Sequence, residues 1–292
     1  MQASVHPTID PRYHYALSQV FGPTLVKRLD DDAHEESIRS LLYHCGLYST
    51  CEQWDLVRGL SKTYEYLRVN YRCEYVYKNE IANQILLRFH HDNSATLLRE
   101  VASDRSIADI VIINGQTVAY EIKTELDNFD RLSGQVESYQ ALYDCLYIVT
   151  HPGAAELICR KVPEAVGVLV LDDKAQLQRV REAQTTAHLF DPAKAVVTLR
   201  QSEMVAAYQK WVGKMPEMGT ARIYTFCHDW YMGLEVEDAR IVFAEALKSR
   251  RPAPYQFNLI LDCDTSLKML FFGRDLSRRY CVSARERLGL SV

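Results

Sequence analysis

Two carboxylates and an ammonium group in the middle of this 292-residue chain have a spacing that suits one kind of chemistry. Asp109 is followed by Glu121 and then by Lys123, and side chains two residues apart in a strand project from the same face. Hydrolysis of a phosphodiester needs an activated water and a counter-charge for the phosphate, and Mg²⁺ supplies both. We therefore expect Asp109 and Glu121 to bind Mg²⁺, for which Mn²⁺ would substitute. Lys123 would hold the attacking water or offset the developing charge.

The residues around these side chains indicate two strands joined by a tight turn. Apolar and β-branched residues dominate 107–113 and 116–124, and the dipeptide Asn114-Gly115 between them is a strong hairpin signal. In a plain two-residue turn, Asp109 would point away from Glu121, and the proposed site could not form.

A three-residue loop at 113–115 would bring the two carboxylates to one face. Gly115 would then adopt the left-handed conformation as part of a bulge, which shifts the pairing by one residue. The expected pairs are Ile112 with Gln116 and Asp109 with Ala119, because the numbers of paired residues must sum to an even value for Asp109 and Glu121 to share a face. A bulge elsewhere in the ladder would have the same effect.

Three further side chains on two expected helices fit the same site. Gln135 and Tyr139 share a face of a helix expected from about 127 to 143. The glutamine would orient the water or a phosphate oxygen, and the tyrosine would hydrogen-bond the lysine or the nucleic-acid backbone. Glu80, in the first turn of a helix expected over 78–89, would be a third metal-binding carboxylate. The alternative for Glu80 is a charge that stabilises the helix N-terminus.

This ordered set resembles the PD-(D/E)XK nuclease superfamily, and within it the RecB-type and Holliday-junction-resolvase-type branches. The residues that carry the resemblance are Glu80, Asp109, Glu121-x-Lys123 and Gln135-xxx-Tyr139. The resemblance covers about residues 76–172, and one departure is Ala108, where the superfamily has a proline. It implies a metal-dependent nuclease with a restriction-endonuclease-like core, acting on nucleic acid, with DNA favoured. Such nucleases serve repair, recombination, restriction or phage defence in bacteria and phages, and many act as homodimers.

The order of the expected elements gives a separate prediction of the fold. Helix, three strands, helix, strand, helix and strand follow one another, which predicts an α/β protein with an αβββαβ core and a mixed central sheet. We expect a helical N-terminal extension at 1–75, the nuclease core at 76–185 and a mainly helical C-terminal domain at 186–292. Residues 1–30 look irregular, and residues 176–184 look helical.

Composition narrows the possible partners. The net charge is −4, yet residues 240–292 contain ten Lys and Arg against five Asp and Glu. This basic segment could contact phosphates or could form solvated helix faces. The eight cysteines show no CxxC spacing, so we expect reduced thiols in a cytoplasmic protein and no structural zinc. We also expect no membrane span and no nucleotide cofactor, because long apolar runs and a glycine-rich phosphate loop are missing from the sequence.

Two alternatives remain open. The tyrosines between 64 and 77 could stack nucleic-acid bases, although packing of an amphipathic helix is the commoner role. The whole chain could also be a nuclease-fold protein that binds or regulates without turnover. The complete set of candidate residues favours the enzyme.

Overall fold

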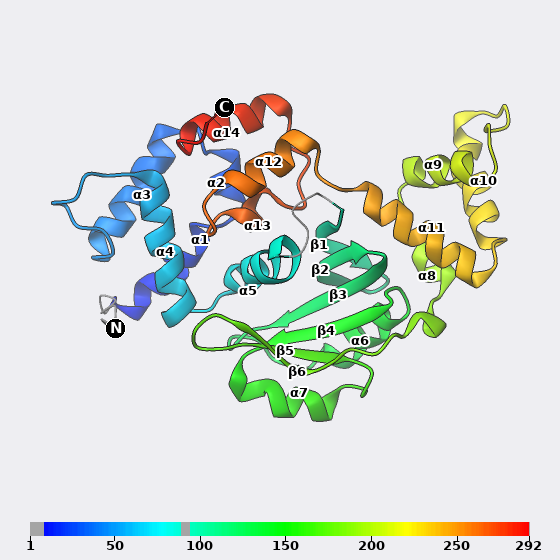
Figure 1. Ribbon diagram of the computed structural model, residues 1–292, viewed down its shortest axis with the longest axis horizontal. Coiled ribbons are helices and arrows are strands. Elements are labelled where there is room, and N and C mark those ends of the chain that lie inside the picture. The colour runs from blue at the N-terminus through cyan, green and yellow to red at the C-terminus, as the bar shows by residue number, and fades with distance from the viewer. Residues whose placement is uncertain (1–8, 89–93, 292) are drawn as a thin grey trace.

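One mixed six-stranded sheet forms the centre of the protein (Figure 1). The computed structural model describes residues 9–88 and 94–291. The strands follow the order β1-β2-β3-β4-β5-β6 across the sheet, with β3-β4 and β4-β5 parallel and the other pairs antiparallel. Their bounds are β1 Thr96–Ser103, β2 Ser106–Asn114, β3 Gln116–Lys123, β4 Cys145–Thr150, β5 Gly167–Leu171 and β6 Leu177–Arg181.

The order of elements confirms the predicted αβββαβ core. Helix α5 (Glu74–Ile81) precedes β1–β3, α6 (Leu132–Gln140) precedes β4, and α7 (Ala155–Lys161) leads to β5. The predicted helix at 176–184 is wrong, because its residues 177–181 form β6 along the edge of β5. The polar residues of this strand are largely solvent-exposed, and a short strand of this kind has a weak alternating pattern.

The two faces of the sheet are covered by different helices. Figure 1 shows α5 on one face and α6 and α7 on the other. Alternate side chains of β3 pack into two separate cores, with Tyr120 and Ile122 on the α5 side and Ala119 on the α6 side. Helix α5 continues into a π-helical turn, Ala82–Leu87, while the end expected at Phe89 lies outside the described residues.

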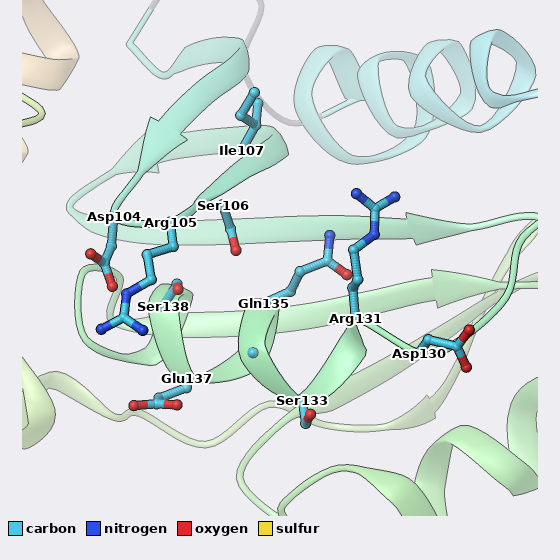
Figure 2. Close-up of a pocket in the computed structure, with 11 residues that line it drawn as sticks. Asp104, Arg105, Ser106, Ile107, Asp130, Arg131, Ser133, Gln135, Glu137 and Ser138 are labelled. Carbon is cyan, nitrogen blue, oxygen red and sulfur yellow. The ribbon is translucent and has the colours of Figure 1, made fainter.

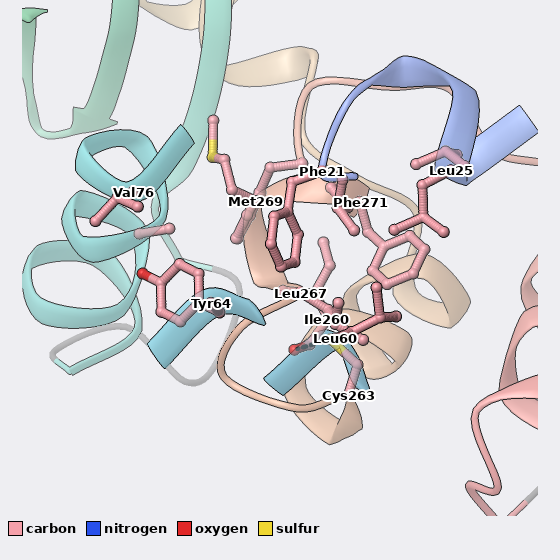
Figure 3. Packing of buried hydrophobic residues seen from close by; sticks show 14 of the residues in the cluster. Phe21, Leu25, Leu60, Tyr64, Val76, Ile260, Cys263, Leu267, Met269 and Phe271 are labelled. Atoms are coloured by element: carbon pink, nitrogen blue, oxygen red, sulfur yellow. Dashed lines mark hydrogen bonds between the residues drawn. The ribbon is translucent and has the colours of Figure 1, made fainter. Parts of the chain in front are cut away.

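The N-terminal helices share one core with the last helices of the chain. Figure 3 shows Phe21 and Leu25 beside Ile260 and Phe271 in this core. The expectation that residues 1–30 are irregular is wrong for residues 9–30, because tertiary packing stabilises two short helices there, and residues 1–8 lie outside the described residues. The N-terminal helices are α1 His14–Gln19, α2 Pro23–Lys27, α3 Asp32–His44 and α4 Leu56–Asn70, and their partners are α12 Pro254–Asp262, α13 Lys268–Phe271 and α14 Arg278–Arg287.

A second group of helices packs on the α6 face of the sheet. Phe243 and Leu247 of α11 and Ala195 of α8 enter the same core as Tyr139 and Val111. These helices are α8 Pro192–Val196, α9 Gln201–Trp211, α10 Thr220–Met232 and α11 Val236–Ser249. The C-terminal region is thus divided between two cores. Short 3₁₀ turns lie at Pro11–Tyr13, Pro152–Ala154 and Ala187–Leu189.

The tyrosines of residues 64–77 pack inside the protein. Tyr64, Tyr66 and Tyr77 are at most 2% exposed, and Tyr75 stacks on Phe21. This confirms packing over base stacking as their role. Within residues 9–88 and 94–291, each helix is too short or too polar to cross a membrane.

Candidate functional site

The β2–β3 hairpin brings Asp109 level with Glu121. Ile110 pairs with Tyr120, so paired residue numbers sum to an even value, as the predicted site requires. The backbone ladder ends at this pair, and beyond it the Asp109 carboxylate accepts a hydrogen bond from the Ile122 amide at 2.7 Å. The strands therefore separate where the two carboxylates face each other.

The turn itself is tighter than expected. Asn114 pairs with Gln116, and Gly115 lies alone at the tip with φ of +73°. The left-handed glycine is as predicted, because this conformation is strained for residues with a Cβ. The predicted pairs Ile112–Gln116 and Asp109–Ala119 are wrong by two residues, since a single glycine reverses the chain.

Glu121 is held by three side chains and is 3% exposed. Lys123 Nζ donates to its Oε1 at 2.8 Å, and Gln135 Nε2 donates to the same atom at 2.6 Å. The Tyr139 hydroxyl lies 2.9 Å from Oε2 and 2.7 Å from the carbonyl oxygen of Ile107. Burial and the charge of Glu121 raise the pKa of Tyr139, so its hydroxyl remains a donor.

Asp109 is less well compensated. Burial and then the charge of Glu121 raise the pKa of Asp109 to about 7. The Ile122 amide and the Lys78 ammonium, 4.0 Å from Oδ1, oppose this shift. Two neighbouring carboxylates of this kind favour a cation beside them, because it lowers the repulsion between the two charges.

Lys78 was not predicted as a member of this site. It lies on α5 with its side chain 5% exposed, and its Nζ contacts Glu74 and lies 3.4 Å from Glu100 as well as near Asp109. Glu100 has a left-handed backbone, φ of +53°, in β1. One ammonium thus serves three carboxylates. A signal for it existed in the sequence, because Glu74 and Lys78 are four residues apart on one helix.

The structure does not bring Glu80 to Asp109 and Glu121. Its Oε1 accepts from the Tyr64 hydroxyl at 2.8 Å and lies 3.0 Å from Arg68 Nε, and its Oε2 accepts from Gln84 at 2.6 Å. The predicted position in a first helical turn is wrong, because α5 begins at Glu74. The earlier start places Glu80 near the end of α5, where it forms a separate buried ion pair.

The residues present fit a Mg²⁺ ion that keeps most of its water ligands. Among the described residues, no group of three or more His, Cys, Asp or Glu could hold a metal. Mg²⁺ is commonly bound by one or two carboxylates with water and phosphate, which Asp109 and Glu121 would satisfy. Gln135 Oε1 is also buried with no hydrogen-bond partner in this structure. A buried acceptor of this kind indicates a missing donor such as a water.

An open cleft of about 680 Å³ adjoins Gln135. It lies between α6 and the turn from β1 to β2, and it is also lined by Arg105, Arg131 and Ile107. Figure 2 shows Arg131 and Gln135 extending from α6 toward the strands, whereas Glu137 points away from them. Arginines in a groove suit phosphate groups. The cleft is connected to Glu121 through Gln135, which donates a hydrogen bond to that carboxylate.

Comparisons with known proteins identify a family for much of the chain. A family model described as bacteriophage P4 protein cII matches residues 67–252, which contain the sheet and the candidate site. Protein cII of Enterobacteria phage P4 is 33% identical over 79 residues, which are 26% of this chain and 30% of that protein. The match thus spans about 30% of the length of this curated relative. No solved structure matches the chain. Because this family model matches more than half of the chain, the chain belongs to the bacteriophage P4 cII protein family.

Proposed function

We propose that this protein is a Mg²⁺-dependent nuclease that hydrolyses phosphodiester bonds of DNA. The observation that carries the proposal is the meeting of Asp109, Glu121 and Lys123 at the point where β2 and β3 separate, with Gln135 and Tyr139 beside them. The resemblance to PD-(D/E)XK nucleases, which rests on the same residues, implies the same chemistry. The cleft beside Gln135 supports a polymeric substrate.

Each side chain would have a separate task. Mg²⁺ held by Asp109 and Glu121 would activate a water and offset the charge on the phosphate. Lys123 would donate a hydrogen bond to the attacking water or to a phosphate oxygen. Gln135 would accept a hydrogen bond from that water through its partnerless Oε1. Tyr139 would keep the Glu121 carboxylate in position.

A second candidate function is binding or regulation of nucleic acid without turnover. One observation favours it: both oxygens of Glu121 already contact protein donors, namely Lys123, Gln135 and Tyr139. In that case the lysine would neutralise Glu121 without a metal. The nuclease proposal instead requires a metal to share or displace at least one of these contacts, so metal binding separates the two functions.

Cleavage of supercoiled, linear and circular single-stranded DNA tests the proposal. The assay compares Mg²⁺, Mn²⁺ and EDTA, with Asp109→Asn, Glu121→Gln and Lys123→Ala beside the wild type. We expect metal-dependent cutting that falls more than about 100-fold in each variant. Glu156→Gln on α7 is the matched control, because this carboxylate is 84% exposed and lines neither the site nor the cleft.

The outcomes distinguish the two functions. Cutting that is lost in the three variants and retained in Glu156→Gln supports the nuclease. A folded wild type that binds DNA but neither cuts it nor binds Mn²⁺ supports the binding protein. Linear product without a nicked intermediate would indicate a homodimer that cuts both strands.

The cellular setting is also part of the proposal. The curated relative is a phage protein, and the eight cysteines are free thiols. Both support action on DNA in the cytoplasm of a bacterium, in restriction, repair or phage defence.

A further inference from the structure

A second cavity, of about 540 Å³, lies where the connection from α11 to α12 passes the edge strand β1. The Thr96 hydroxyl of β1 donates to the carbonyl of Lys248 in α11 at 3.0 Å, which fixes these segments together. The charged residues that line the cavity are Arg99, Arg200, Arg250, Arg251 and Arg274, with Glu100 and Asp275.

Two of the five arginines are neutralised by the protein itself. Arg250 donates to both oxygens of Glu203, at 2.7 and 2.8 Å. Arg99 donates to Glu100 at 2.8 Å. These two guanidinium groups are therefore structural, and they form part of the cavity wall.

The other three arginines are less closely matched by the carboxylates of the described residues. Arg200 is 70% exposed and 3.8 Å from Glu203, and the Arg251 side chain makes no hydrogen bond or ion pair within residues 9–88 and 94–291. Arg274 donates to the carbonyl of Leu270 at 3.0 Å. Burial and then the charge of nearby Arg99 lower the pKa of Arg274, and the charge of Glu100 opposes this shift. Such a group of guanidinium ions favours an anion.

The cavity shares a wall with the candidate active site. Glu100 lines the cavity and lies 3.4 Å from Lys78 Nζ, which in turn lies 4.0 Å from the Asp109 carboxylate. A polymer with regularly spaced negative charges could therefore occupy the cavity while another of its charged groups is at Asp109.

We propose that this cavity binds backbone phosphates of the same nucleic-acid strand that the active site cuts, an inference that rests on the proposed nuclease function. Arg200, Arg251 and Arg274 would contact phosphate oxygens, for which the forked guanidinium is well suited. The contacts would be independent of base sequence, because only the backbone carries this charge.

The proposal assigns phosphate contacts to only some of the basic residues of segment 240–292. Arg240, Arg285 and Arg287 form ion pairs with carboxylates of the protein, so they are structural. Arg251 and Arg274 line the cavity and are left for a partner.

Fluorescence anisotropy of labelled single-stranded and duplex DNA in EDTA tests the cavity while no strand is cut. The test variant is Arg200→Gln/Arg251→Gln, and the control is Arg160→Gln/Lys161→Gln on α7, where Arg160 is 68% exposed. We expect the test variant to bind about tenfold more weakly, with a salt slope smaller by about 1.5 to 2. The control should keep the wild-type affinity and slope. Arg274→Gln should weaken binding in the same direction.

Several results would overturn the proposal. One is that Arg200→Gln/Arg251→Gln binds DNA as tightly as the wild type does. Another is that the control variant loses as much DNA affinity as the test variant, which would indicate only general attraction of DNA to the basic surface. Displacement of DNA by polyglutamate as effectively as by inorganic polyphosphate would assign the cavity to an acidic protein instead.

Failure of the phosphate-binding proposal for the cavity can be distinguished from failure of the proposed nuclease function. Hydrolysis of thymidine 5′-p-nitrophenyl phosphate, which is too small to reach both sites, reports on the active site alone. Turnover of this ester with unchanged DNA binding by the test variant rejects the cavity and keeps the nuclease. Weakened DNA binding by the test variant, with a wild type that hydrolyses neither ester nor DNA, keeps the cavity and rejects the nuclease.

Discussion

Glu80 is a buried acid and Asp109 a partly buried one, and their surroundings differ in charge. Glu80 is matched by Arg68 and by hydrogen bonds from Tyr64 and Gln84. Asp109 faces a second carboxylate, Glu121, and its nearest ammonium is 4.0 Å away and shared with two other acids. A carboxylate with a structural role is neutralised by its neighbours. The unbalanced charge of Asp109 is what the proposed metal site requires.

The largest expected effect is the loss of stability on removing the charge of Glu80. Glu80→Gln would leave Arg68 without its buried partner, which should lower the free energy of unfolding by about 3 kcal/mol. This is at the low end for a buried pair, because Arg68 also contacts Glu65. Urea unfolding measures the change. The folded variant should still cut DNA, and loss of Mn²⁺ binding in it would return Glu80 to the metal site.

Metal should stabilise only the protein that retains the Asp109 carboxylate. At a Mn²⁺ concentration about 100 times its Kd, the free energy of unfolding should rise by about 2.7 kcal/mol. Asp109→Asn should show almost none of this increase, whereas Glu80→Gln should show it in full. Thermal unfolding with Mn²⁺ and with EDTA provides the measurement. An equal increase in Asp109→Asn would exclude this carboxylate as a ligand.

Without metal, Asp109 should make stability depend on pH. Its pKa is raised from 3.8 to about 7, so the folded protein binds the proton more tightly than the unfolded chain does. The favourable contribution is complete below about pH 4 and is lost as the pH rises through about 7. In EDTA above pH 7, Asp109→Asn should therefore be more stable than wild type by at least about 1 kcal/mol. Parallel stability profiles for the two proteins between pH 4 and 8 would contradict the shift.

The smallest expected effects come from two tyrosines, one that donates to Glu80 and one that donates to Glu121. Tyr64 lies 2.8 Å from Glu80, and Tyr139 lies 2.9 Å from Glu121. Each change to Phe should lower stability by about 1 kcal/mol. Only Tyr139→Phe should also reduce cleavage, by about tenfold, because Tyr139 positions Glu121, the carboxylate that we propose binds the metal. Equal cleavage by Tyr64→Phe and Tyr139→Phe would contradict the assignment of a structural role to Glu80 and a catalytic role to Glu121.

Local patterns were sufficient to predict the hairpin and the shared helix face of Gln135 and Tyr139. The contact of Tyr139 with Glu121, in place of the expected contact with Lys123, was not predicted. The apolar and β-branched runs and Asn114-Gly115 predicted β2 and β3. The parity argument predicted that Asp109 and Glu121 share a face, although the predicted register was wrong by two residues. Gln135 and Tyr139 both contact Glu121, as their four-residue spacing allows.

Features that depend on distant contacts could not be predicted in this way. Helix α5 starts after Cys73, which makes no side-chain cap, so the sequence carries no start signal there. The predicted helix started four residues too late, at Lys78. Glu80 was therefore assigned to the metal site, and the role of Lys78 was not predicted. The contact of Tyr280 with the carbonyl of Val26, 254 residues apart, shows why the shared core of the two termini was also missed.

The left-handed backbone at Glu100 also affects how the sheet can meet other molecules. Edge strands attract further strands unless their ladder is interrupted or charged. In β1 the ladder is interrupted at Glu100, and Gly273 lies against the neighbouring Arg99 side chain. At the opposite edge, β6 has five residues, of which Arg179 and Arg181 are charged. Both borders of the sheet therefore resist extension, and copies of this protein that associate would meet through helices and not through added strands.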